Sequence, residues 1–250
     1  MTALSLTLEH LSAAAPVAAV DVTVPSQTLW WLNRATGLVL LVQFTLVVIL
    51  GVLSTARRLP FKMPAFVTNE LHRKLALMTV ALLGIHIVTS VLDSYVDIDV
   101  WDAVVPFASP YRPIWLGLGT LAVDLLIAAL IATAWRRRLS ERTWRVVHAF
   151  TYVAWGASVL HGLGTGTDAR NPAVQIVTAV CVVLVIMAVA ARVAGLVTLP
   201  QPARITALIG LAVAPVLVTL WAVGGPLAPG WAEKAGTPPP ESTATVAVTP

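Results

Sequence analysis

Six runs of about twenty mostly apolar residues dominate the chain, and they limit what it can fold into. A helix needs about 20 apolar residues to cross the hydrocarbon core of a bilayer. We therefore predict an all-α integral membrane protein, a bundle of six transmembrane helices. The composition agrees, since 58% of the residues are hydrophobic and 11% are charged, whereas soluble chains have about 25% charged residues. The expected spans are residues 30–53, 71–92, 113–135, 144–163, 172–194 and 204–223.

Four segments are expected along the chain. Residues 1–29 form a flexible N-terminal tail, which lacks the Lys and Arg that open a secretory signal. Residues 30–194 form the main membrane domain, and residues 195–224 add a sixth transmembrane helix. Residues 225–250 are rich in Pro, Thr and Ala, so we expect a disordered C-terminal tail. The single cysteine, Cys181, excludes an internal disulfide framework and any cysteine-ligated cluster.

The basic residues are distributed unevenly between the two sides of the membrane. Lys and Arg resist translocation, so short loops rich in them stay in the cytoplasm. Of the 16 basic residues, all but Arg34, Arg112, Arg170 and Lys234 lie at the first, third and fifth loops or the adjoining helix ends. We therefore expect both termini to lie outside, with the second and fourth helices running outward from the cytoplasm.

Four of the five histidines lie inside predicted spans, where ionisable side chains are costly and mark functional sites. His72 and His86 are fourteen residues apart on the second helix, and His148 and His161 are thirteen apart on the fourth. These separations correspond to about 20 Å along a helix axis. Since both helices run in the same direction, His72 is level with His148, and His86 is level with His161.

Facing pairs of neutral imidazoles on two helices are the ligands that six-coordinate b-type haem requires. The four histidines are thus candidate iron ligands for two b-type haems. Alternatively, each is a hydrogen-bonded residue of the bundle interior, or relays protons with Asp124 in a transporter. A separation of thirteen leaves a rotation of about 140° on an ideal helix, so the fourth helix needs different rotamers, tilt or a distortion near Gly156. Candidate glycines for close helix or haem approach are Gly37, Gly84, Gly156 and Gly162.

Several longer motifs accompany these histidines, including LHRKLAL around His72 and RTWRVVHAFTYVAWGASVLHGLGTGTD around His148 and His161. Together with NRATGLVLL and DSYVDIDVWDAVVPFASPYRPIWLGLG, they resemble actinobacterial members of the ferric reductase-like transmembrane family. That family includes NADPH oxidases, ferric reductases and the membrane subunit of bacterial periplasmic methionine sulfoxide reductase. The resemblance covers about residues 30–194. It implies two haems, one shared by His72 and His148 and the other by His86 and His161.

Basic side chains near these levels are candidate partners for haem propionates. Arg73 and Arg145 flank the inner pair, although cytoplasmic helix ends carry basic residues for topology alone. Arg34 and Arg112 lie at outer helix ends, against the charge bias of that side. We expect no flavin or nicotinamide site within this chain, because no strand precedes a glycine-rich phosphate loop.

The function expected from the resemblance is a b-type dihaem cytochrome of the cell membrane, an electron-transfer subunit of an oxidoreductase system. It would take electrons from a cytoplasmic reductase or a quinol and pass them to an extracytoplasmic flavoprotein or reductase. The alternatives are a quinol-oxidising cytochrome b subunit of a larger dehydrogenase and a proton-coupled transporter. The lipid bilayer is a predicted partner, and nucleic acid is not. The acidic outer loop, residues 93–112, is a candidate docking surface for the acceptor.

Overall fold

The computed structural model describes residues 26–55, 64–93, 96–196 and 199–237. All its long elements are helices, and six of them are long and apolar enough to cross a membrane. They are α2 (Ser26–Thr55), α3 (Ala65–Leu92), α4 (Pro113–Ala134), α5 (Glu141–Thr165), α6 (Pro172–Ala194) and α7 (Gln201–Gly224). Two short elements lie between and after them, the 3-10 helix η1 (Val100–Ala103) and α8 (Trp231–Lys234). The prediction of an all-α six-helix membrane bundle is confirmed.

Local sequence signals fix several of the helix ends. The Ser140 hydroxyl accepts a hydrogen bond from the Thr143 N–H at the start of α5, and the Asn171 side chain accepts one from the Ala173 N–H at the start of α6. Such side-chain caps satisfy backbone donors that lack a partner within the helix. Pro113 and Pro172 each lie in a first turn, where a missing N–H costs nothing.

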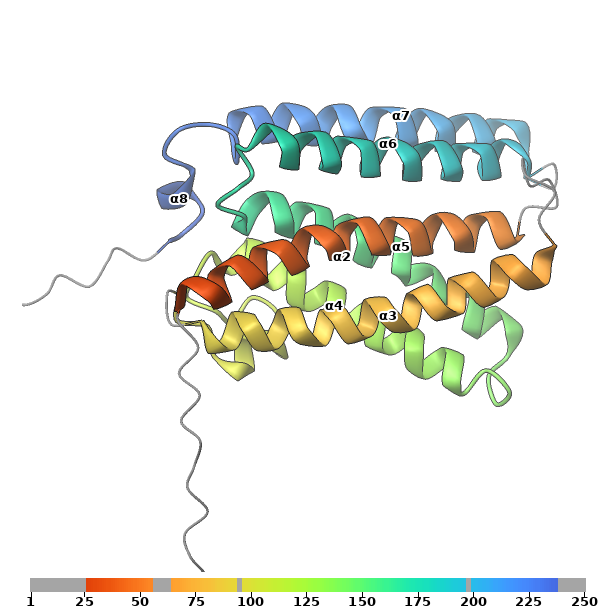
Figure 1. Ribbon diagram of the computed structural model, residues 1–250. Coiled ribbons are helices and arrows are strands. Elements are labelled where there is room, and N and C mark those ends of the chain that lie inside the picture. The colour runs from red at the N-terminus through yellow and green to blue at the C-terminus, as the bar shows by residue number, and fades with distance from the viewer. Residues whose placement is uncertain (1–25, 56–63, 94–95, 197–198, 238–250) are drawn as a thin grey trace, which may run out of the picture.

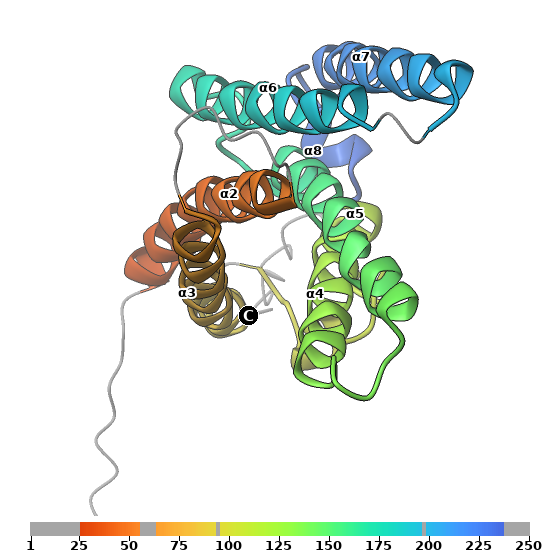
Figure 2. The same cartoon turned by 90° about the vertical axis from the view of Figure 1, so that its right-hand side faces the viewer.

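The bundle consists of two helical hairpins and an outer pair of helices. α2 packs along α3, and α4 packs along α5; α2 also contacts α5, which joins the hairpins. α3 and α4 lie apart on the other side (Figure 2). α6 packs on α2, and α7 packs on α6 as an outer layer (Figure 1). The core lies where α2, α4, α5 and α6 meet, around Phe44, Ala122, Ala154 and Val185.

The two ends of the bundle differ in charge and in cover. At one end, here called the α8 end, α2 begins and α8 folds over the bundle (Figure 1). At the other, the basic end, Arg136, Arg137 and Arg138 follow α4. Both ends of the described chain lie at the α8 end.

Both tail boundaries expected from the sequence need correction. Residues 26–29 belong to α2, because the helix begins before its first tryptophan. Residues 225–237 are ordered: the Arg112 N–H donates to the Gly236 carbonyl, and the Trp231 indole N–H donates to the Gly164 carbonyl. The Trp231 and Trp221 rings also pack against the Trp115 ring. These contacts anchor the segment despite its Pro-rich composition. Residues 1–25 and 238–250 of the expected tails lie outside the described residues.

Candidate functional site

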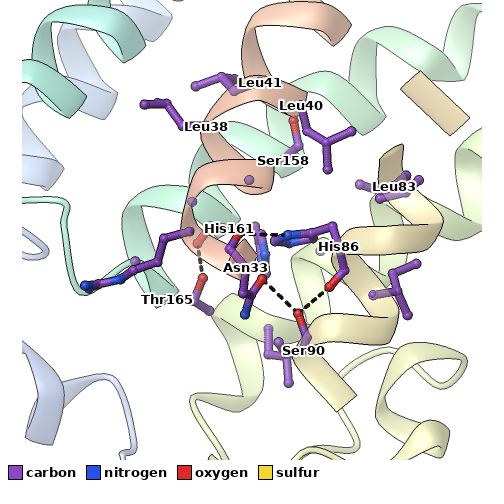
Figure 3. Close-up of a pocket in the computed structure, with 18 of the residues that line it drawn as sticks. Asn33, Leu38, Leu40, Leu41, Leu83, His86, Ser90, Ser158, His161 and Thr165 are labelled. Atoms are coloured by element: carbon purple, nitrogen blue, oxygen red, sulfur yellow. Dashed lines mark hydrogen bonds between the residues drawn. The ribbon is translucent and has the colours of Figure 1, made fainter. Parts of the chain in front are cut away.

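The four intramembrane histidines project from two helices, α3 and α5, and form two groups by depth. Near the basic end, the ring centroids of His72 and His148 are 6.3 Å apart, with their planes at 64°. Nearer the α8 end, His86 and His161 line one cavity (Figure 3). The structure therefore brings together the same pairs that depth along the helices suggested.

His72 is oriented by a backbone group of the neighbouring helix. Its Nδ1 lies 3.0 Å from the Val47 carbonyl oxygen on α2. A carbonyl oxygen only accepts hydrogen bonds, so Nδ1 must carry the proton of the neutral ring. The lone pair is then on Nε2. This tautomer is the one that histidine ligands of metals usually adopt, with the other ring N–H donated to a carbonyl.

The two histidines nearer the α8 end are held in the same way. Nδ1 of His86 lies 3.2 Å from the Asn33 carbonyl oxygen on α2. Nδ1 of His161 lies 2.9 Å from the Trp115 carbonyl oxygen on α4. In both rings, the proton is again assigned to Nδ1 and the lone pair to Nε2.

Each of these three histidines lies against what we call a carbonyl–glycine pair. In such a pair, the carbonyl of one residue accepts the Nδ1–H of the histidine, and a glycine follows four positions later. A Cβ on the glycine would lie 3.2 Å from Cε1 of His86 or His72, and 2.5 Å from Nδ1 of His161. Any larger residue would therefore crowd the imidazole. The pairs are Asn33 with Gly37, Val47 with Gly51, and Trp115 with Gly119.

The fourth histidine has a different environment. Fourteen residues after Trp115 and Gly119, the corresponding positions on α4 hold Ala129 and Thr133. The Thr133 hydroxyl donates to the Ala129 carbonyl at 2.7 Å, and the buried Nδ1 of His148 has no hydrogen-bond partner in the described chain. The Trp144 ring stacks on the His148 ring, with centroids 5.1 Å apart and planes at 15°.

The two histidines at the ends of this separation of thirteen on α5 have different surroundings. The helix is continuous through Gly156, and a Cβ there would meet nothing within 4 Å. The two histidines instead differ in their side-chain partners, since His161 bonds to a carbonyl of α4 and His148 stacks on a tryptophan of its own helix.

The cavity at the α8 end has a volume of about 510 Å³, within the range of about 300–1,000 Å³ typical of ligand sites. Its lining is mainly apolar, as with Leu40 and Leu83, and polar groups gather around Asn33 and Ser90 (Figure 3). The Ser90 hydroxyl lies 3.0 Å from the Asn33 side-chain oxygen and 2.8 Å from the His86 carbonyl. These contacts fix the α2–α3 wall beside the histidine.

Only one of the four arginines singled out from the sequence lines this cavity. Arg34 pairs with Asp168 at 3.1 Å and lies over the Trp30 ring. Arg112 is buried, and its guanidinium donates to the carbonyls of Gly164 and Thr165.

The other two arginines lie on the surface at the basic end. Arg73 forms an exposed ion pair with Glu70, and Arg145 forms one with Glu141. Both pairs join neighbouring turns of one helix. For both side chains, a topological role is therefore the simpler interpretation.

Asp124 is half-buried on α4, and the structure does not join it to the polar residues near its depth. The Thr45 hydroxyl accepts from the Trp155 indole N–H, and the Thr79 hydroxyl donates to the Leu75 carbonyl. Within the described residues, a relay from Asp124 to the histidines has no hydrogen-bonded path.

Sequence reasoning missed most of the carbonyl–glycine pairs. Of the glycines expected at close approaches, Gly37 is confirmed, whereas a Cβ on Gly84, Gly156 or Gly162 would meet nothing within 4 Å. Gly51 and Gly119 were not identified. A signal was present: Gly37 and Gly51 are fourteen residues apart, as are His72 and His86 on the antiparallel neighbour.

The centroid distance of the basic-side pair matches that of two imidazoles that bind one metal ion from opposite sides. A first-row metal ion lies about 2.0 Å from a bound histidine nitrogen, and with about 1.2 Å from nitrogen to centroid, rings on opposite sides have centroids about 6.4 Å apart. The observed value is 6.3 Å. No cluster of three or more His, Cys, Asp or Glu side chains suited to a bare metal ion occurs in the described ranges. Haem needs only two protein ligands per iron.

Comparison with known proteins gives a family but no described activity. No curated protein and no solved structure matches the chain. One family model matches residues 28–168, a range that begins in α2 and ends just after α5. That range contains all four intramembrane histidines and all three carbonyl–glycine pairs, and it leaves out α6 and α7. The chain belongs to this family, which is described as a domain of unknown function (DUF8596).

Proposed function

We propose that this protein is a b-type dihaem cytochrome that carries electrons across the membrane. The observation that carries the proposal is the basic-side pair, whose ring centroids are 6.3 Å apart. His72 adds chemical support, since its Nδ1–H is donated to a carbonyl and its Nε2 is free to bind iron. The repeat of this arrangement at the other depth, with His86 and His161, supports two centres rather than one.

Each histidine pair would hold one haem, through one imidazole nitrogen of each residue. When bound, the haem supplies a reversible one-electron couple at its iron. The carbonyl–glycine pairs fix the tautomer and the orientation of three of the ligands. Around the α8-side pair, apolar side chains such as Leu40 and Leu83 line the cavity and would pack on the macrocycle. Arg34 is the basic side chain placed to balance anionic groups there.

The proposed direction of electron transfer and the proposed partners rest on the distribution of basic residues and on the resemblance to the ferric reductase-like family. We assign the basic end to the cytoplasm and both termini to the outside of the cell membrane, because basic loops resist translocation. Electrons would come from a cytoplasmic reductase or a quinol and leave to an extracytoplasmic flavoprotein or reductase. The similarity of the histidine motifs to the ferric reductase-like family supports this direction.

The test is haem stoichiometry in purified protein after haem-replete expression. A pyridine haemochrome assay should give two b-type haems per wild-type chain. Each of His72→Ala and His148→Ala should remove one haem, and the double variant should remove no more than either single variant. The variants at His86 and His161 should behave in the same way for the second haem.

The fifth histidine provides the matched control. His10→Ala should keep both haems, because His10 lies outside the predicted spans. Circular dichroism should show that every variant keeps its helical content. Wild-type protein that is helical but colourless would contradict the proposal, and so would a fully additive loss in the His72 and His148 double variant.

A further inference from the structure

The connection between α3 and α4 folds back along α4 instead of rising away from the bundle. The Thr120 hydroxyl donates to the Asp102 carbonyl at 2.6 Å. Thr120 lies seven residues into α4, about 10 Å along its axis from Pro113. Phe107 packs on the same face, because a Cβ on Gly117 would lie 2.5 Å from the Phe107 backbone nitrogen. The segment from Asp99 to Ser109 therefore descends beside the first two turns of α4.

On the inward side of this segment, two buried polar side chains form hydrogen bonds within the segment and with Tyr111. Asp102 is buried, and its carboxylate accepts from the Asp99 N–H at 3.1 Å. The buried Ser109 hydroxyl accepts from the Tyr111 N–H. Asp102 and Ala103 also line the cavity that contains His86 and His161.

Apart from the exposed Asp99 at its start, the outward side of the same segment is apolar and uncovered in the described chain. The side chains concerned are large, and each leaves about half or more of its surface exposed. They are Val100, Trp101, Val104, Val105 and Phe107, with exposed fractions of 64%, 72%, 56%, 47% and 49%.

The length of α4 gives the depth of this apolar surface in the membrane. Its 22 residues span about 33 Å, close to the hydrocarbon thickness of about 30 Å. A segment level with Thr120 therefore lies within the hydrocarbon when α4 crosses the bilayer. Further along α4, the exposed Ile127 continues this apolar surface, because it is seven residues after Thr120 and lies on the same side of the helix.

Irregular backbone at this depth needs partners for its polar groups within the protein, and several groups of the segment have them. The N–H of Asp102 donates to the Asp99 carbonyl, and the N–H groups of Val104 and Val105 donate to the Trp101 carbonyl. The carbonyl of Asp102 accepts from Thr120.

From this, we propose that Asp99 to Ser109 forms a re-entrant segment embedded in the leaflet at the α8 end. Its five exposed apolar side chains contact lipid acyl chains, and its inward side closes the space between α3 and α4, which lie apart (Figure 2). This surface is then a lipid contact, in place of the protein-docking surface that the loop's position in the sequence suggested. The inference rests on packing and depth and is independent of haem binding.

The test uses site-directed spin labels in protein reconstituted into phosphatidylcholine liposomes. In a Cys181→Ala background, single cysteines replace Trp101 and Val104 and carry the label. We expect high accessibility to oxygen and low accessibility to a water-soluble nickel chelate at both positions. Ile127→Cys is the lipid-facing control on α4, and Lys234→Cys on α8 is the aqueous control, since both residues are exposed.

Labels at positions 101 and 104 that match the Lys234 control would overturn the proposal and would favour a water-facing docking surface. A second measurement avoids reliance on labelled variants. Tryptophan emission quenched by brominated lipids is compared between unlabelled wild type and Trp101→Phe. The proposal expects the variant to lose a strongly quenched component, and an unchanged quenched fraction would contradict it.

Discussion

The two histidine pairs differ in their surroundings. Both histidines of the pair nearer α8 lie against a carbonyl–glycine pair, whereas only one histidine of the pair nearer the basic end does. At the α8 side, both His86 and His161 donate to a carbonyl, and a glycine lies beside each ring. At the basic side, His72 has the same environment, whereas the His148 ring stacks on Trp144, whose indole N–H lies 3.4 Å from the Thr133 hydroxyl. Since hydrogen bonds to ligand histidines tune a metal centre, the two centres should differ in their properties.

Among the substitutions considered, Gly119→Ala should have the largest effect on haem binding. A Cβ there would lie 2.5 Å from the His161 Nδ1, and that ring is fixed by the Trp115 carbonyl. Gly119→Ala should therefore displace the ligand and lower the haemochrome value from two haems per chain to one. Gly156→Ala is the matched control, with open space at its Cβ, and should keep both haems. Two retained haems in Gly119→Ala would show that the carbonyl–glycine pair does not position His161.

A smaller effect is expected at Gly51, where a Cβ would lie 3.2 Å from the His72 Cε1. Gly51→Ala should retain both haems but destabilise the holoprotein by about 1–2 kcal/mol, the usual range for modest overpacking. Thermal unfolding in detergent measures this change. At the uncrowded Gly84, the same substitution should be neutral or stabilising by up to about 1 kcal/mol. Equal unfolding temperatures for the two variants would contradict the crowding argument.

Thr133→Gly should make the two centres more alike. The substitution removes the hydroxyl that donates to the Ala129 carbonyl. By its position fourteen residues after Trp115, we expect this carbonyl then to accept from the His148 Nδ1, which would make the imidazole a stronger donor. We expect the basic-side potential to fall by tens of millivolts, given about 59 mV per tenfold change for one electron. Redox titration followed by optical absorbance measures the shift, and Thr133→Ser should leave it near zero. An unchanged potential in Thr133→Gly would show that contacts other than Thr133 determine the donor strength of His148.

The smallest effect is expected for Trp144→Phe. Phenylalanine keeps an aromatic ring beside His148, but it is smaller than the indole and lacks its N–H, which lies 3.4 Å from the Thr133 hydroxyl. Both haems should remain, with a basic-side potential shift below that of Thr133→Gly. The same redox titration checks this. A larger shift than in Thr133→Gly would show that Trp144, more than Thr133, sets the potential of the basic-side centre.

The fold was predictable from sequence because the bilayer imposes a simple length requirement. Each apolar run of about twenty residues became a helix of the expected kind. Local signals were weaker guides to the ends: the helix that begins at Ser26 was expected only from Trp30, and the Pro-rich stretch after α7 was expected to be disordered. The latter is ordered through long-range contacts, such as Trp231 with Gly164, that no local pattern encodes.

The candidate site was only partly predictable for a similar reason. The histidine pairs follow from helical rise alone, which is a local property. The acceptor carbonyls of Asn33, Val47 and Trp115 depend on which helices pack together, and any residue can supply a carbonyl. The hydrogen bonds of Arg112 were not predictable for the same reason, because they go to the carbonyls of Gly164 and Thr165 and to the Thr237 hydroxyl, all distant in sequence.

The central claim is that His72 with His148, and His86 with His161, ligate two haem irons. Low-temperature electron paramagnetic resonance of the oxidised, purified protein tests it most directly. We expect two distinct low-spin ferric signals of bis-histidine type, because the two pairs have different hydrogen bonds. Replacement of His148 should abolish one signal and leave the other unchanged. Protein without haem iron, or with only high-spin five-coordinate iron, would contradict the account.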